Sequence, residues 1–532
     1  MGDSCATTCA LYPRDADTGR TQVREVGDCL RYHRAVTTAA AIERRERRSL
    51  APAHIVGFAV LASIFAKSMA EKLAEHDLWW HLKTGQIIVA THHVLRADPF
   101  SFTVPGKSWV DGQWLSEVVM RGVQATSGLR GIIVWRSVML VATYAVVAWL
   151  LVEVGGNRLA TWAIIALASY AGVPAWIERP ILFSFLIFAV VLTMTLRRSS
   201  RIWWLVPLFA LWANLHGLFI LGLGYLFVLT AAETFKASRG KGDHAWARRL
   251  DSVTLVCLLA TFLNPYGPKL LTYSLGLVKT VSQTASEWAS PNFHESLTYP
   301  FLLLALLVLA SLALSEERPD LTDVVLAIVF LGLGLYAERN LPVSGMVLGY
   351  VCVRYTPSAV RAALRLQRAR TTSAINPAVG VLAIVLVAAV LAVGVWHRFP
   401  KSDALTAVAD PALPVATIAS LPDSGVHLFI DDRWAGLAIY MKWPGTHVAF
   451  DGRGDVYGSA IIGKFEKTIS GGIGWETWLR QICPTHVLIE ENGGLANVIE
   501  RSPDWRVVRR DPIAGGTAVL LVPSGRLAGC PA

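Results

Sequence analysis

Long apolar segments alternate with short polar ones from about residue 54 to residue 396 of this 532-residue chain. A helix needs about 17 to 25 predominantly apolar residues to cross the roughly 30 Å hydrocarbon layer of a bilayer. The pattern predicts about eleven such spans, at residues 53–71, 131–152, 159–175, 181–196, 202–214, 217–235, 253–268, 299–315, 321–337, 341–353 and 378–396. The segment 202–214 is short and ends at Asn214 and His216, so it is either a span or a broken element shielded from lipid.

Beyond residue 397 the apolar runs become short and alternate with helix-like segments. This alternation is typical of an α/β domain. Strands are predicted at residues 426–430, 447–450, 487–490, 507–509 and 518–522, with helices at 434–442 and 475–482. We therefore predict a small α/β domain over residues 398–532.

Composition agrees with a membrane protein. Hydrophobic residues make up 53% of the chain and charged residues only 17%, with a mean hydropathy of +0.45. So much apolar surface exceeds what the core of a soluble protein holds. The predicted fold class is a polytopic α-helical membrane protein with about eleven transmembrane helices and a C-terminal extracytoplasmic α/β domain.

The net charge of +10 comes from basic residues that lie between the predicted spans. Such clusters mark cytoplasmic loops, which makes nucleic-acid binding the weaker explanation. The clusters begin at Arg44, Arg197, Lys236 and Arg354. They predict a cytoplasmic N-terminal arm (1–52), a transmembrane domain (53–397) with a long first outer loop (72–130), and an outer C-terminal domain. The expected location is the inner (plasma) membrane of the cell, with the N-terminus in the cytoplasm.

Ionisable residues gather at the predicted outer ends of the spans. The segments are Glu75-His76-Asp77, Glu178-Arg179-Pro180, Asn214-Leu215-His216, Ser286-Glu287-Trp288 and Glu338-Arg339-Asn340. An unpaired charge at the centre of the bilayer costs about 2.5 to 3.5 kcal/mol on insertion scales. We therefore predict that these residues converge in one outer site. For each residue, the alternative is an interfacial charge or a local pair such as Glu338 with Arg339.

Three further features of the outer segments carry predictions. Glu117 and Arg121 have the i,i+4 spacing of a helical ion pair. Asp431-Asp432-Arg433 and Asp451-Gly452-Arg453-Gly454-Asp455 follow predicted strands, where ligands bind in open α/β sheets, although turn chemistry explains them equally well. Cys483 and Cys530 are the cysteines of the predicted outer domain, and we predict a disulfide between them if their Cα atoms approach within ~7 Å.

Several of these motifs together resemble a known superfamily. They are the run from His76 to Gly85, Asp98-Pro99-Phe100-Ser101, Glu178-Arg179-Pro180, the run from Trp212 to Gly217, Asn264-Pro265-Tyr266-Gly267, Ser286-Glu287-Trp288 and Asp451-Gly452-Arg453. The chain resembles a bacterial family of GT-C-like membrane proteins over residues 55–525. It is distantly similar to protein O-mannosyltransferases and to the catalytic subunit of oligosaccharyltransferase.

The resemblance implies a glycosyltransferase that moves a sugar from a polyprenyl-phosphate donor to an extracytoplasmic glycan, lipid or protein acceptor. It also implies that Asp77 acts as catalytic base or organises the site, and Glu287 is the second catalytic candidate. The substrate-binding candidates are His76, Trp80, His81, Arg179, His216, Arg339, Asp451 and Arg453. The cofactor is open: the second outer loop lacks an Asp-x-Asp, so no clear motif supports a divalent metal.

Two other function classes remain open at this point. A transporter or flippase of a lipid-linked sugar would use the same partners, the bilayer and a polyprenyl-phosphate sugar. A non-catalytic assembly or sensor protein would use the outer domain alone. Transporters place polar residues near the membrane midplane, whereas here they lie at the predicted outer ends, which favours the transferase.

Overall fold

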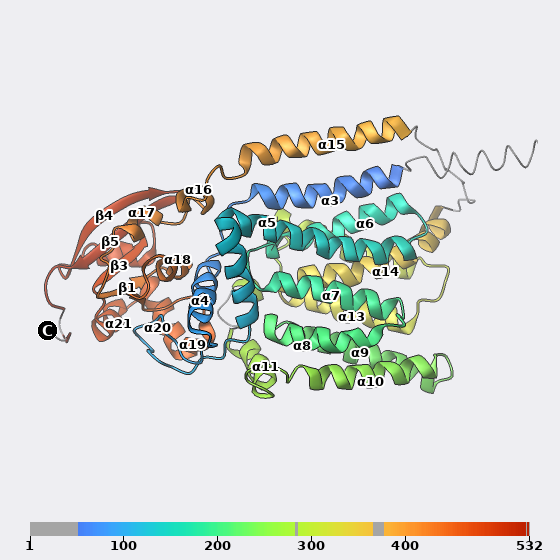
Figure 1. Ribbon diagram of the computed structural model, residues 1–532, viewed down its shortest axis with the longest axis horizontal. Coiled ribbons are helices and arrows are strands. Elements are labelled where there is room, and N and C mark those ends of the chain that lie inside the picture. The colour runs from blue at the N-terminus through green and yellow to red at the C-terminus, as the bar shows by residue number, and fades with distance from the viewer. Residues whose placement is uncertain (1–51, 282–285, 365–376, 528, 531–532) are drawn as a thin grey trace, which may run out of the picture.

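The computed structural model describes residues 52–281, 286–364, 377–527 and 529–530. Figure 1 shows an elongated molecule with a body of roughly aligned helices at one end and a domain containing a sheet at the other. The predicted N-terminal arm falls outside the described residues, except for Pro52. Nearly all of the outer candidate residues lie where the two parts of the molecule meet.

A helix occupies each predicted span within the described residues. The helices are α3 (Pro52–Ala70), α5 (Trp114–Val154), α6 (Arg158–Tyr170), α7 (Ile181–Leu196), α8 (Leu205–Leu215), α9 (Phe219–Ser238), α10 (His244–Ala260), α12 (Tyr299–Ala313), α13 (Leu321–Tyr336), α14 (Leu341–Leu364) and α15 (Pro377–Arg398). By length and apolar composition, 5 helices of the described chain are able to cross a membrane, and four shorter helices are also apolar. The number of crossings and their direction stay predictions.

Two helix boundaries differ from the predicted ones. α10 begins nine residues before the predicted segment 253–268, because the Asp243 side chain caps its first turn by accepting from the N–H groups of Ala245 and Trp246. α5 joins the part of the first outer loop that contains Glu117 to the predicted span 131–152. It consists of two helices that meet at a kink at Gly128, whose φ of 69° is not helical. The first of them runs across the direction of the aligned helices, at the end of the helical body that faces the C-terminal domain (Figure 1).

The long first loop contains one further helix, α4 (Leu78–Thr91), and α11 (Lys269–Val281) lies in a later loop. α4 packs between the first part of α5 and α18 (Asp432–Lys442) of the C-terminal domain (Figure 1). Its Leu78, Trp79 and Trp80 are buried. This burial explains the Trp-rich sequence of the loop, because the loop packs against protein on both sides.

The C-terminal domain is built on a five-stranded sheet in the order β2-β1-β3-β5-β4. The strands are β1 (Val426–Ile430), β2 (Thr446–Val448), β3 (His486–Glu490), β4 (Trp505–Ile513) and β5 (Gly516–Pro523). β1 runs parallel to β2 and β3, and β5 runs antiparallel to β3 and β4. The remaining helices are α16 (Leu405–Val408), α17 (Val415–Ala419), α19 (Gly454–Tyr457), α20 (Ser459–Ile469), α21 (Trp475–Ile482) and α22 (Gly494–Ile499). Cys483 and Cys530 form a disulfide, as predicted.

The first loop and the C-terminal domain share backbone hydrogen bonds as well as side-chain packing. The N–H of Phe102 donates to the carbonyl of Val448 at 3.1 Å, and the N–H of Val448 donates to the carbonyl of Phe100 at 3.0 Å. Trp443 Nε1 donates to the carbonyl of Pro99 at 3.0 Å. The two backbone bonds form a parallel bridge between Ser101 and Val448 beside β2, so the first loop is attached to the domain at this edge of the sheet.

Candidate functional site

A cavity of about 510 Å³ opens where the helical body meets the C-terminal domain. Its wall combines membrane helices, the loops between them and the segment that follows β2. Seven of the ten predicted site residues line it, namely Asp77, Trp80, Arg179, His216, Glu287, Arg339 and Arg453. The structure therefore brings together residues from the outer ends of five predicted spans, namely Asp77, Arg179, His216, Glu287 and Arg339, as the sequence predicts. The roles of all seven residues stay proposals.

One half of the cavity is apolar and is built by two membrane helices. α9 contributes Leu221, Gly224, Tyr225 and Val228, and α13 contributes Val329, Phe330 and Leu333. We call these seven residues the tail groove. A methyl group built at Gly224 would meet no atom within 4 Å, so the glycine leaves open space along the groove. The apolar half of the cavity thus extends from the loops to a position between α9 and α13.

The other half is charged and centres on Arg179. Arg179 Nη1 donates to Glu287 Oε2 at 2.9 Å, and Nη2 donates to Asp77 Oδ2. Pro180 caps α7, which holds Arg179 at the end of the helix. Its neighbour Glu178 turns the opposite way and pairs with buried Arg136 of α5. One guanidinium therefore joins two carboxylates that are 210 residues apart in the sequence.

Arg339 extends this network. Its Nη1 donates to Glu287 Oε1 at 2.9 Å, and its guanidinium lies 4.4 Å from the centre of the Trp288 ring. Arg339 thus pairs with Glu287 and not with its neighbour Glu338, the local pair that the sequence offers as an alternative. Glu287 therefore pairs with two arginines. Burial alone would raise the pKa of Glu287, but the charges of Arg179 and Arg339 together lower it more, so the pKa lies below its usual value.

Asp77 stands at the first turn of α4 and is 2% exposed. Trp80 Nε1 donates to Asp77 Oδ1 at 2.9 Å. The backbone of Gly452 lies so close that a Cβ there would collide with the Asp77 carboxylate. Burial raises the pKa of Asp77, but Arg179 and then His76 and His81 outweigh it and hold the pKa below its usual range. The neighbouring cation therefore favours the ionised form of Asp77, which makes this carboxylate a weaker proton acceptor than an isolated one.

Arg453 reaches the cavity from the C-terminal domain. Its Nη2 lies 2.7 Å from Asp98 Oδ1 and 2.7 Å from Asp451 Oδ2, and its guanidinium lies 4.9 Å from the Trp109 ring. All three charged groups are buried. Asp451 therefore lies beneath Arg453 rather than on the cavity wall. The motif Asp451-Gly452-Arg453 fastens the domain to the first loop and at the same time places Gly452 beside Asp77.

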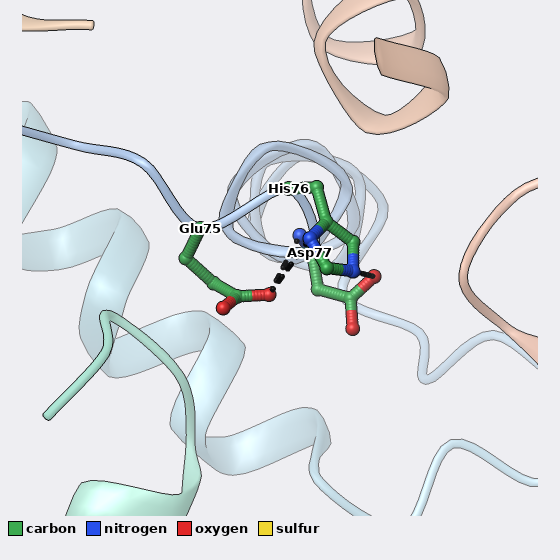
Figure 2. Close-up of side chains that lie close together, drawn as sticks. All are labelled: Glu75, His76 and Asp77. Carbon is green, nitrogen blue, oxygen red and sulfur yellow. Dashed lines mark hydrogen bonds and ion pairs between the residues drawn. The ribbon is translucent and has the colours of Figure 1, made fainter. Parts of the chain in front are cut away.

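Two other predicted binding residues also lie away from the cavity wall. His81 is 1% exposed, and its Nδ1 lies 2.8 Å from Glu117 Oε1. Glu117 is completely buried beneath α4, and Arg121 donates instead to Gln124 at 2.7 Å, so the prediction of an ion pair between Glu117 and Arg121 is wrong. The side chain of His76 is 41% exposed, and its Nε2 lies 4.0 Å from Asp77 Oδ1 (Figure 2).

The motif Asp431-Asp432-Arg433 has local contacts. Asp431 caps α18 and pairs with Arg433 at 2.7 Å, and Arg433 also pairs with Glu490 at 2.8 Å. This is the turn chemistry that formed the alternative prediction for this motif. Arg433 is more than half exposed.

Glu75, His76 and Asp77 bring their ligand atoms within 4.8 Å of one another, which suits a metal ion (Figure 2). The residues around them do not fit one. Arg179 Nε lies 3.8 Å from Glu75 Oε1, and the same guanidinium donates to Asp77. A divalent cation bound to these oxygens would stand next to a fixed positive charge. The geometry favours Arg179 as the cation of this site.

The structure adds Asp111, which the sequence did not single out, to the cavity wall. Asp455, from the motif that begins at Asp451, also lines the cavity and accepts from the hydroxyl of Tyr273 in α11. Asp111 is a single acid between Val110 and Gly112 and follows no spacing rule. Only its position before α5 connects it to the site.

Solved structures with a similar fold include the oligosaccharyltransferase AglB from Archaeoglobus fulgidus, determined in complex with an inhibitory peptide and a dolichol-phosphate. The identity is 11%, over 82% of this chain and 69% of that chain, with a TM-score of 0.54. The complex of the same enzyme with zinc and sulfate matches with 12% identity, over 82% and 68% of the two chains, and a TM-score of 0.50. ArnT from Cupriavidus metallidurans bound to undecaprenyl phosphate matches with 14% identity, over 90% and 99%, and a TM-score of 0.47.

No protein-family model and no curated protein sequence matches the chain. The predicted resemblance to GT-C glycosyltransferases is confirmed at the level of the fold. Together with its apolar helices, this fold makes the chain a multi-pass membrane protein.

Proposed function

We propose that this protein is a membrane glycosyltransferase that moves a sugar from a polyprenyl-phosphate donor to an acceptor on the outer side of the membrane. The observation that carries the proposal is the two-part cavity, in which the tail groove continues into the network of Arg179, Glu287 and Arg339. A lipid with an anionic headgroup has the same two parts in the same order. The AglB fold, solved with a dolichol-phosphate, supports this type of ligand.

The arginines suit the leaving group of such a reaction. When the acceptor oxygen attacks the anomeric carbon, the bond to the phosphate oxygen breaks and its electron pair stays on the phosphate. Cations near that oxygen stabilise the transition state more than the ground state. Arg179 and Arg339 lie at the boundary between the groove and the charged half, and His216 lines the same wall. We assign the phosphate to this group.

The carboxylates suit the sugar. Glycosyl transfer passes through a transition state that resembles an oxocarbenium ion, and a fixed anion next to the ring lowers its energy. Asp77 has this charge, and Trp80, which donates to it, also lines the cavity. Glu287 orients both arginines. The proposed catalytic residues are therefore Asp77 and Glu287, with no step through a metal.

The outer location of the acceptor rests on the predicted topology. The disulfide between Cys483 and Cys530 is typical of an oxidising compartment and supports an extracytoplasmic C-terminal domain. The charged half lies at the ends of α8 and α13, next to that domain. A transporter would need such residues near the midplane, so this arrangement favours the transferase.

A reconstituted assay tests the proposal. The purified full chain is placed in vesicles with polyprenyl phosphates that carry different labelled sugars, and an envelope extract supplies acceptors. We expect that polyprenyl phosphate is released and that the labelled sugar appears on an acceptor molecule from the extract. Label that crosses the vesicle membrane while it remains on its carrier would identify a transporter instead. Glycan mass spectrometry of cells with and without the gene then identifies the product.

A further inference from the structure

The cavity wall carries one buried carboxylate that has no role in the reaction described so far. Asp111, in the loop before α5, is 1% exposed and lines the cavity. The N–H of Gln113 donates to its Oδ1 at 3.3 Å, and the N–H of Asp111 donates to the Tyr266 hydroxyl at 3.1 Å. Its Oδ2 is buried, and within the described residues no N–H or hydroxyl group donates to it. An oxygen in this state faces a ligand or a proton.

Glu117 supplies the proton. It is completely buried, its carboxyl group lies within hydrogen-bonding reach of that of Asp111, and its Oε2 likewise has no donor group in the part of the chain that the structure describes. Two carboxyl groups in contact inside a protein do not both ionise, so they share a proton. Glu117 Oε1 is 2.8 Å from His81 Nδ1.

His81 fixes which carboxyl group holds that proton. Burial lowers the pKa of His81 to about 3, although Asp77 opposes the shift, so its ring is neutral. A neutral ring with its proton on Nδ1 donates to Glu117 Oε1. Glu117 then donates its own proton to Asp111. The chain from His81 through Glu117 to Asp111 leaves Asp111 as the ionised member and the one that lines the cavity.

The surroundings shift the pKa values of Asp111 and Asp77 in opposite directions. Burial raises the pKa of Asp111 to about 7, with a smaller contribution from Asp455, against the opposing hydrogen bonds from Glu117 and Gln113 and the charge of Arg453. Asp77 is shifted the opposite way by Arg179. The titratable and charged groups packed around Asp111 are Glu117, His81, Tyr266, Tyr273, Arg453 and Asp455. A carboxylate that titrates near neutral pH is the better proton acceptor.

We infer that Asp111 accepts the proton of the acceptor hydroxyl, with Glu117 and His81 as its positioning residues. This inference rests on the proposed function. In the step, the acceptor oxygen bonds to the anomeric carbon, its proton moves to Asp111 Oδ2, and the phosphate leaves with the electron pair of the broken bond. Asp77 stays ionised throughout and faces the positive charge that develops on the sugar.

The test is the pH dependence of turnover by the full chain in vesicles. For the wild type we expect kcat to rise with pH through a limb near 7, because Asp111 must be unprotonated. Asp111→Asn should lower kcat by about 10² to 10⁴-fold and remove the limb. Glu117→Gln retains a donor and an acceptor and should keep the limb. Glu117→Leu removes the donor, which raises the pKa of Asp111, so the limb should move to higher pH.

A second readout needs no turnover. Infrared spectra of protein with ¹³C-labelled aspartate should contain a protonated carboxyl band that disappears near pH 7 and is absent in Asp111→Asn. Glu476→Gln, at an exposed pair with Arg480, is the control for both readouts.

Transfer by the wild type with an unchanged limb in Asp111→Asn would overturn this inference and leave the proposed function standing. A missing band would also overturn it. A wild type that transfers no sugar would overturn the proposed function, and the proton step with it.

Discussion

Gly224 offers a direct test of the tail groove. Because a Cβ at this position meets no atom within 4 Å, Gly224→Leu fits the fold, and leucine is also the better helix former by about 0.5 to 1 kcal/mol. The new side chain fills part of the groove between α9 and α13. We therefore expect normal expression and thermal stability together with weaker binding of a long-chain donor.

The magnitude follows from the apolar contact that is lost. Each buried CH₂ is worth about 0.8 kcal/mol, and a leucine side chain displaces about four such groups of the lipid. The loss is about 3 kcal/mol, which corresponds to binding weaker by on the order of a hundredfold. Because the tail contributes equally to the ground state and the transition state, KM should rise while kcat stays near the wild-type value.

The assay compares KM for donors with long and short polyprenyl chains. Gly332→Leu on α13 is the matched control, since Gly332 also has open space around it but is exposed outside the cavity. A donor whose chain is too short to reach Gly224 should be used equally well by wild type and variant. Equal KM values for Gly224→Leu and Gly332→Leu with the long donor would refute the assignment of the groove.

Asp77→Asn keeps the hydrogen bond from Trp80 but removes the charge, and turnover should fall by about 10² to 10³-fold in the transfer assay, with donor binding retained. Arg339→Gln should raise the concentration of polyprenyl phosphate needed to inhibit transfer, because Glu287 keeps only Arg179. An engineered cysteine at exposed Ser459 should react with an impermeant thiol reagent in intact cells, whereas one at exposed Ser200 should react only after lysis. Labelling with the opposite pattern would reverse the predicted orientation.

The positions of the helices follow from the sequence because lipid imposes a simple rule on length and polarity. Their ends do not, since local caps decide them. α10 begins at Asp243, well inside a basic segment that hydropathy assigns to a loop. β1, β2, β3 and β5 lie within two residues of the predicted strands at each end, because each is a short apolar run between turn residues. β4 is an exception: the sequence predicts only residues 507–509, whereas the strand covers Trp505–Ile513 and is mostly exposed, so it carries little apolar signal.

The convergence of the outer charges was predictable in outline, but the partners were not. Because an unpaired charge is costly in lipid, the sequence predicts that Arg179 and Glu287 have partners of opposite charge. It does not predict that they pair with each other, because no spacing rule relates residues so far apart in the chain. Glu117 illustrates the limit: its spacing to Arg121 predicts a surface pair, whereas α4 from the same loop buries it against His81. Periodicity within one helix carries no information about which other helix will cover it.

The C-terminal domain and the membrane site form one unit through backbone contact. Gly452 touches the Asp77 carboxylate, and a methyl group there would displace Asp77 from Arg179. Arg453, the next residue, is held by Asp98 of the first loop and by Asp451 of its own domain. Because two carboxylates fix this arginine, the Gly452 backbone has little freedom to move away. The domain therefore sets the position of the anion on which the proposed chemistry depends, even though few of its side chains face the cavity.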